Sequence, residues 1–286
     1  MRIGGAVAAT AVVLCMAACA PEAESSPIGA QAGGDGIIIV REKRHEHPDQ
    51  FLAAVKEIQS RCFEAKAVVA QAQGWTYDPA SERLSDTEIF QLDTERTAEY
   101  FEGKRYAKVV SGARMDVSRM EPIRGGSCKP VAVRFKSVEV DDGNCNVFRV
   151  QYDVAAKTGQ REILKNVCAA PGAPPTQGGE PVSVPGTSSQ CKWTPKVKLG
   201  AVVLPTPNEC TLLPSPVHKG TGRPLVAIRM MPDHLRSAST PLPGMQATSM
   251  LGLVTIEQAV QISVGTRMPD GTFDMPADAA SFPLAH

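Results

Sequence analysis

A change of hydrophobic period near residue 74 constrains the fold more than any other feature of this chain. From Pro48, apolar residues recur at steps of four and three, which places them on one stripe of a helix. Pro48 and Asp49 suit a first helical turn, and Gly74 marks the latest end. We therefore expect one long helix with polar residues Lys56, Glu57 and Gln59 facing away from the stripe formed by Phe51, Val55, Ile58, Cys62, Ala65 and Val69.

Outside this helix the apolar positions alternate with a period near two, as in half-buried strands. We expect a strand at 37–40 before the helix and further strands at 89–92, 100–110, 131–140, 147–155 and 162–167. The turns at 141–144 and 157–159 favour hairpins, because Gly and Asn tolerate positive φ. The predicted fold class is α+β, with one long helix packed on an antiparallel meander in a domain at 37–168.

The composition changes after residue 168. Five prolines between 169 and 190 predict a linker, and charged residues fall from 41 in 37–168 to 14 in 191–286. The region 191–286 is Pro-rich and is predicted to be mainly β, with strands at 197–204 and 225–230. Thr255 and Gln258 form a capping-box pattern that predicts a helix, although the β-branched residues that follow also fit a strand. Alternatively, parts of this region complete the sheet of the first domain.

The first twenty residues have the layout of a secretory signal peptide. Arg2 is followed by an apolar stretch at 6–14, which is too short to span a bilayer, and then by small residues before Cys19. The run Met16-Ala17-Ala18-Cys19 resembles the lipobox of bacterial lipoproteins, with Met16 where leucine is usual. The resemblance implies a signal peptide at 1–18 and acylation of Cys19, palmitate included. Ordinary cleavage after Ala20 is the alternative, but it would leave Pro21 directly after the cut.

The lipobox also implies a location. Ala20 stands where an aspartate would favour retention in the inner membrane, so we expect a lipoprotein of the Gram-negative outer membrane that faces the periplasm. Segment 19–36 is rich in Ala, Gly, Ser and Pro and has no apolar periodicity, which is typical of a flexible tether.

Six cysteines lie beyond the leader, and an even number in an exported chain indicates disulfides. A hairpin about 157–158 would place Cys145 nearly opposite Cys168, which is compatible with a cross-strand bridge. We further expect Cys191 to pair with Cys210 across a short loop. This leaves Cys62 for Cys128, one of 15 pairings that six cysteines permit.

Other residue patterns suggest chemistry only weakly. Thioethers and imidazole suit copper, so the methionine-rich C-terminal region is a candidate copper site, against the simpler interpretation that its methionines fill an irregular core. His45 and His47 fit a solvated turn better than a metal site, and Asp270, Asp274 and Asp278 fit a polar loop better than a calcium site. The candidate copper ligands are Met230, Met231, His234, Met245 and Met250.

Equal numbers of acidic and basic residues, 30 of each, argue against nucleic-acid binding. The sequence contains none of the common nucleophile, phosphate-loop or zinc-protease motifs. We therefore expect a non-catalytic envelope lipoprotein without a cofactor, which acts through contacts with an envelope protein or the cell wall. One alternative is an envelope hydrolase whose site forms only in three dimensions, recognisable as a concave pocket with two or more ionisable side chains. The other is a copper-binding protein.

Overall fold

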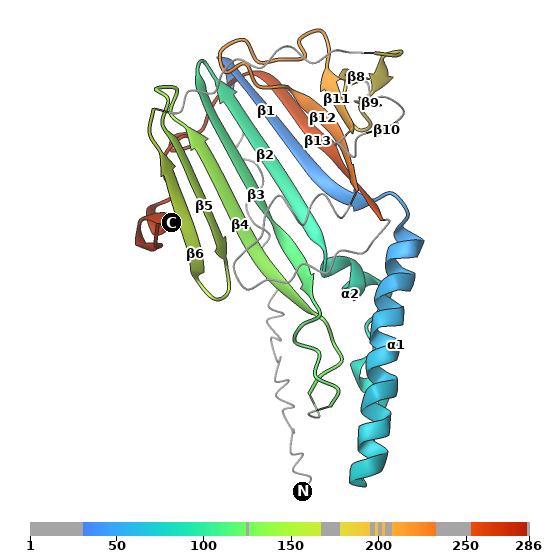
Figure 1. The fold of residues 1–286 in the computed structure, drawn as a ribbon. Coiled ribbons are helices and arrows are strands. Elements are labelled where there is room, and N and C mark those ends of the chain that lie inside the picture. The colour runs from blue at the N-terminus through green and yellow to red at the C-terminus, as the bar shows by residue number, and fades with distance from the viewer. Residues whose placement is uncertain are drawn as a thin grey trace, which may run out of the picture.

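The computed structural model describes residues 31–123, 126–166, 178–194, 198–199, 202–203, 208–232 and 253–284. Its main feature is one antiparallel sheet of 11 strands in the order β6-β5-β4-β3-β2-β1-β13-β12-β11-β8-β7 (Figure 1). The strands of this sheet are β1 (Gln31–His45), β2 (Thr94–Glu102), β3 (Arg105–Asp116), β4 (Val131–Asp141), β5 (Val147–Asp153), β6 (Thr158–Leu164), β7 (Val182–Ser183), β8 (Gln190–Trp193), β11 (Asn208–Leu212), β12 (Val226–Pro232) and β13 (Val254–Arg267). Two short strands, β9 (Lys198–Leu199) and β10 (Val202–Val203), pair separately.

The predicted fold class is wrong: the chain is mainly β, and its long helix does not cover the sheet. Helix α1 (Pro48–Gln73) begins at one end of the sheet and projects beyond it (Figure 1). Only the first turns of α1 reach the strands, where Phe51 and Val55 pack with Met115 at the end of β3 and with Ile89 and Leu92 of the next segment. The apolar stripe of α1 therefore packs against the end of the sheet and does not cover either of its faces.

The long helix itself is confirmed. It begins at Pro48, and Gly74 ends it in the left-handed conformation with φ 73°. Two other local predictions are wrong. Residues 89–92 do not form a strand, because Ser85 and Glu88 form a capping box that starts α2 (Asp86–Gln91). Residues 100–110 are not one strand, because the chain turns at Gly103, with φ 56°, between β2 and β3.

Strands from both sides of the predicted 169–190 linker belong to the same sheet. β13 pairs with β1 on one side and with β12 on the other, so the C-terminal region completes the sheet, as the alternative interpretation expected. The helix predicted from Thr255 is wrong and the alternative strand is right. Residues 254–267 are rich in β-branched side chains and obtain hydrogen-bonding neighbours on both edges.

The two faces of the sheet are buried differently. On the outer face, residues such as Ile38, Val140 and Tyr152 are covered by the C-terminal segment through Met268 and Phe282. That segment contains the short 3-10 helix η2 (Ala277–Ser281). On the inner face, which carries the side chains that alternate with these, an apolar core forms at one end only. There Ile39, Phe101 and Tyr106 pack against Val184, Leu212 and Leu225.

Candidate functional site

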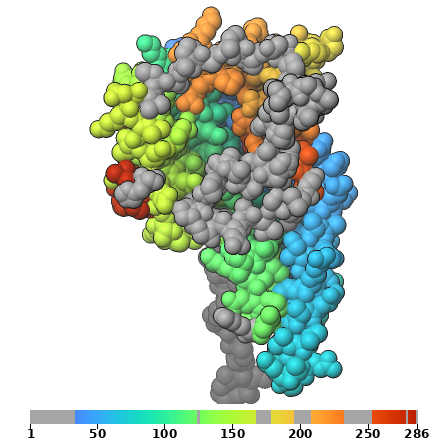
Figure 2. All heavy atoms as spheres, viewed as in Figure 1, coloured from blue at the N-terminus to red at the C-terminus, as the bar shows by residue number. Residues whose placement is uncertain are grey.

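A cleft of about 440 Å³ opens on the inner face, beside the apolar core. Its walls come from β2 to β6 on one side and from β12 and β13 on the other. Figure 2 shows the molecule hollowed between these two sides. Most of the residues that line it are charged or polar, with Lys108, Ser137, Glu139, Arg149, Gln151 and Arg229 among them, and Phe135 and Met231 add apolar surface.

A row of alternating charges crosses the sheet through this cleft, and we call it the charge ladder. On β6 to β2, residues at directly opposed positions carry charges of alternating sign. The same alternation continues on β13, β12 and β11, and Arg41 of β1 stands between the two series. Opposite charges on facing positions of neighbouring strands attract each other. In spatial order, the ladder consists of Glu162, Arg149, Glu139, Lys108, Glu99, Arg41, Glu257, Arg229 and Glu209.

Arg41 lies at the centre of the ladder and is fully buried. Its Nη1 atom lies 2.6 Å from Oε2 of Glu99, and its Nε atom lies 3.6 Å from Oε2 of Glu257. It also donates a hydrogen bond to the carbonyl oxygen of Val226. Burial by itself would raise the pKa of Glu99, but the charges of Arg41, Lys108 and Arg229 outweigh burial and lower that pKa to about 2.

On each side of Arg41 in the ladder, one arginine contacts two glutamates. Arg149 contacts Glu139 at 3.0 Å and Glu162 at 3.3 Å, whereas Arg229 contacts Glu209 at 2.8 Å and Glu257 at 3.7 Å. These forked contacts hold the carboxylates in place along the cleft.

Tyr106 and Arg223 contact two carboxylates of the ladder, Glu99 and Glu139. The hydroxyl of Tyr106 donates to Oε1 of Glu99 at 2.7 Å, and the guanidinium of Arg223 lies 3.8 Å from the centre of the Tyr106 ring. Arg223 also contacts the second oxygen of Glu139 at 3.1 Å. Burial and the neighbouring Glu99 raise the pKa of Tyr106 well above its usual value, so its hydroxyl stays a donor.

Several donors of the residues that line the cleft have no hydrogen-bond partner in the described part of the chain, and the buried Nε atom of Arg161 is one of them. Lys108 Nζ forms neither a hydrogen bond nor an ion pair there, although it stands between Glu99 and Glu139 in the ladder. Gln151 Nε2 is buried and donates no hydrogen bond to any described group. Ser137, which faces Gln151 across β4 and β5, is likewise without a hydrogen bond in the described part of the chain.

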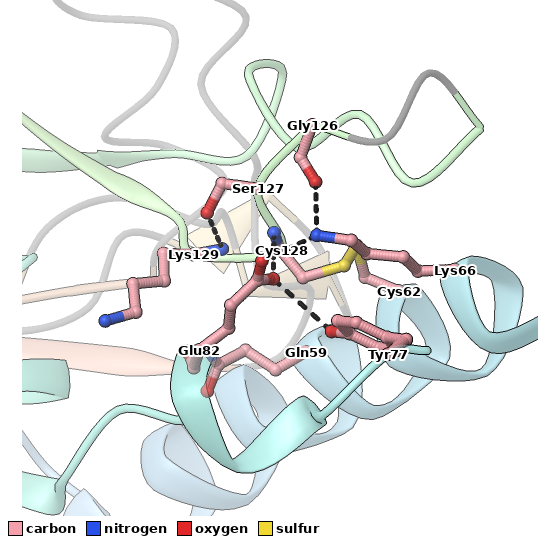
Figure 3. Close-up of a disulfide and its surroundings, with 9 residues drawn as sticks. All are labelled: Gln59, Cys62, Lys66, Tyr77, Glu82, Gly126, Ser127, Cys128 and Lys129. Atoms are coloured by element: carbon pink, nitrogen blue, oxygen red, sulfur yellow. Dashed lines mark hydrogen bonds and ion pairs between the residues drawn. A yellow bond between two sulfur atoms is a disulfide. The ribbon is translucent and has the colours of Figure 1, made fainter. Parts of the chain in front are cut away.

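A second polar cluster lies beyond the end of the sheet, around the disulfide between Cys62 and Cys128 (Figure 3). Glu82, at the end of the 3-10 helix η1 (Pro79–Glu82), accepts from Lys66 Nζ at 2.6 Å and from the backbone N–H of Cys128 at 2.7 Å. Lys66 also donates to the carbonyl oxygen of Gly126. The cluster therefore fastens the β3–β4 connection to α1 by charge as well as by a covalent bond.

This cluster was not predicted from the sequence, because polar side chains were expected to be exposed to solvent. Gln59 and Lys66 are 2% and 5% exposed, yet Gln59 was predicted to face away from the apolar stripe. Tyr77 donates to Glu82 at 3.3 Å, and burial together with Glu82 raises the pKa of Tyr77 to about 12. Burial favours a higher pKa for Glu82, but the bonds from Lys66 and Cys128 lower it.

The disulfide predictions are confirmed where the structure describes both partners. Cys62 is bonded to Cys128, and Cys191 to Cys210. Cys145 is disulfide-bonded, whereas its predicted partner Cys168 lies outside the described residues. The lipidation residue Cys19 also lies outside them.

The predicted copper ligands are not brought together within the described ranges. Met230 and Met231 are consecutive on β12, so their side chains point to opposite faces, and only Met231 lines the cleft. His234, Met245 and Met250 lie outside the described residues. Across the described part of the chain, no three His, Cys, Asp or Glu side chains gather in a way that would hold a metal ion.

The two histidines before α1 have different surroundings. His45 stacks on Phe51 with ring centres 3.8 Å apart, and its Nε2 atom lies 3.2 Å from Oδ2 of Asp93. His47 is exposed at the N-terminus of α1. The prediction of a solvated turn therefore holds for His47 and fails for His45.

Comparisons with known proteins identify no relative. No protein family, no curated protein and no solved structure matches this chain. Within the described residues, no helix has both the length and the apolar character needed to cross a membrane.

Proposed function

We propose that this protein is a lipoprotein of the Gram-negative outer membrane, anchored through Cys19 and facing the periplasm, that binds a polar partner in the cleft of its inner face. The cleft lined by the charge ladder carries the binding part of the proposal. Its volume of about 440 Å³ lies within the range of roughly 300 to 1,000 Å³ that is typical of small-molecule sites. The two disulfides support the periplasmic location, because disulfides persist in oxidising compartments.

Fixed charges make the cleft suitable for recognition. The arginines of the ladder already hold its carboxylates in one arrangement, so a ligand meets a surface that needs little reorganisation. Preorganised polar groups of this kind fix the orientation of a ligand and reject ligands that leave them unpaired.

A hydrolase is the second candidate, because the cleft is a concave pocket with more than two ionisable side chains, the feature expected of such an enzyme. The contacts of the carboxylates favour binding instead. Glu139, Glu162 and Glu257 each lie near an arginine guanidinium, at 3.0, 3.3 and 3.7 Å. Contacts between a carboxylate and a guanidinium hold both groups in a fixed arrangement, which suits the recognition of a ligand.

The anchor is tested by metabolic labelling with palmitate, followed by separation of inner and outer membranes. We expect label on the intact chain in the outer-membrane fraction, and none on the Cys19→Ser variant. Cys15→Ser is the matched control, because Cys15 lies in the leader without small residues before it. Label that persists in Cys19→Ser would contradict the anchor.

Binding is tested by thermal shift of the detergent-solubilised protein against amino acids, short peptides, sugar acids and cell-wall fragments. Ser137→Phe would fill the cleft, and Ala132→Phe would place the same ring on the opposite face of β4, where Ala132 is exposed. We expect a stabilising ligand to lose its effect in Ser137→Phe and to keep it in Ala132→Phe. Equal stabilisation of both variants would place binding elsewhere, and turnover of a probe abolished by Glu139→Gln would favour the hydrolase.

A further inference from the structure

We propose that the cleft binds a monocarboxylate, and that Lys108 Nζ and Gln151 Nε2 are the groups that hold its carboxylate. This proposal rests on the binding function proposed above and names the class of ligand. In the cleft, the carboxylate acceptors beside Lys108 already have partners, whereas several donors form no hydrogen bond.

The acceptors around Lys108 are already occupied. Glu99 accepts from Tyr106 with one oxygen and contacts Arg41 with the other. Glu139 contacts Arg149 with one oxygen and Arg223 with the other. The carboxylates beside Lys108 therefore have little capacity left for a donor brought by a ligand.

The donors are not occupied. Within the described residues, the amide nitrogen of Gln151 and the hydroxyl of Ser137 form no hydrogen bond, and the ammonium of Lys108 forms neither a hydrogen bond nor a close ion pair, although its charge acts on Glu99. Buried or half-buried donors of this kind are normally paired in a folded protein. A ligand that supplies acceptor oxygens would complete the set.

The register places these donors together. Ser137 of β4 is opposite Gln151 of β5, and Lys108 of β3 is opposite Glu139, two residues along β4 from Ser137. Diagonal neighbours on one face lie about 7–8 Å apart, a gap that a long lysine side chain can bridge. All three residues line the same cleft.

The charge of the surroundings selects one carboxylate over a polyanion. The charged residues that line the cleft are five cations, Lys108, Arg114, Arg149, Arg161 and Arg229, and four carboxylates, Glu95, Glu139, Glu162 and Glu257. The lining therefore lacks the large excess of positive charge that would favour a polyanion. A phosphate or a dicarboxylate would meet Glu139 and Glu162 beside the donors, and like charges repel. A single carboxylate matches the one free ammonium.

The test uses N-acetylalanine and its uncharged counterpart N-acetylalanine amide, which differ only in the carboxylate. Full-length mature protein in detergent micelles, labelled with ¹³C-lysine, would be titrated while the Lys108 ε-methylene signal is followed. We expect a saturable shift with N-acetylalanine, a much smaller one with the amide, and little response to inorganic phosphate. Absence of a saturable Lys108 shift at millimolar N-acetylalanine would overturn the proposal, as would an equal response to the amide or a stronger response to phosphate.

Variants separate the roles of the two donors from general effects on folding. Lys108→Met and Gln151→Glu should each weaken binding of N-acetylalanine roughly tenfold or more, because each removes a hydrogen bond to a charged group. Binding by these variants is followed by the thermal shift of the protein. Lys136→Met is the matched control, since Lys136 lies on the opposite face of β4. Unchanged binding in Lys108→Met would overturn the assignment of this residue.

The outcome also distinguishes this proposal from the one on which it rests. If another polar molecule binds and loses its effect in Ser137→Phe while N-acetylalanine does not bind, the carboxylate assignment fails and the cleft remains the site. If no molecule in the screen binds in a way that Ser137→Phe abolishes, both proposals fail.

Discussion

Arg41 on β1 and Glu99 on β2 form a buried ion pair in which Nη1 lies 2.6 Å from Oε2. This pair joins the two halves of the charge ladder, because Arg41 also reaches Glu257 on β13 at 3.6 Å. The ladder thus links strands from the beginning and the end of the chain.

Removing the central cation should strongly destabilise the fold. Arg41→Met leaves Glu99 and Glu257 buried without this partner, and breaking a buried pair in this way costs about 3–5 kcal/mol. Urea unfolding measures the change. Arg96→Met is the control, because Arg96 contacts Glu42 at 3.9 Å with both side chains about half exposed, and such pairs contribute about 0–1 kcal/mol. Similar small losses in the two variants would contradict a structural role for Arg41.

Acid should weaken the protein through Glu99. Its pKa is about 2 in the folded protein, against an ordinary value of 4.5. The ionised form is therefore favoured by folding, and its contribution is complete above pH 4.5 and lost as the pH falls toward 2. The loss is about 3 kcal/mol if the whole shift is counted. Urea unfolding across this pH range should show a shallower decline for Glu99→Gln, and equal slopes would refute this origin.

The two disulfides should contribute unequally. Cys62 and Cys128 are separated by 66 residues and Cys191 and Cys210 by 19. Closing the longer loop restricts the unfolded chain more, which corresponds to about 4 kcal/mol against about 3 kcal/mol. Urea unfolding of the paired variants Cys62→Ala/Cys128→Ala and Cys191→Ala/Cys210→Ala should reproduce this order. A reversed order would show that effects in the folded state dominate.

Glu82 should control both the β3–β4 connection and the ionisation of Tyr77. In Glu82→Gln the side chain is neutral, so Lys66 loses its ion pair and Tyr77 loses a neighbouring negative charge. The pKa of Tyr77 should fall below its value of about 12, which ultraviolet difference titration measures. Exchange of the Cys128 amide hydrogen should become faster, because its acceptor is weakened.

Glu88→Gln provides the comparison for this prediction. Glu88 is exposed in the capping box of α2, so its replacement removes a glutamate charge without touching the cluster around Glu82. Tyr77 and Cys128 should behave in Glu88→Gln as in the unmodified protein. The same change of Tyr77 in both variants would mean that overall charge, and not the contact with Glu82, determines its pKa.

Local patterns were sufficient to predict several elements. The stripe that starts at Pro48 and the glycine at 74 determined α1, since helix period and capping act within a few residues. The turn at 141–144 determined the β4–β5 hairpin, in which Gly143 has φ 78°. The pairings Cys62–Cys128 and Cys191–Cys210 were also predicted correctly, although other pairings were open.

Only the tertiary structure decided how these elements combine. The segment after Thr255 contains both a capping pattern and β-branched residues, and pairing with β1 and β12 made it a strand. The ladder depends on the register of strands far apart in sequence, and a shift of one residue would turn its charges to the other face. Arg41 and Lys66 look solvent-exposed in sequence, because a buried charge is stable only beside partners that the fold brings from elsewhere. Sequence therefore determined the long helix, the β4–β5 turn and these two disulfide pairings, whereas long-range strand pairing decided the sheet and its cleft.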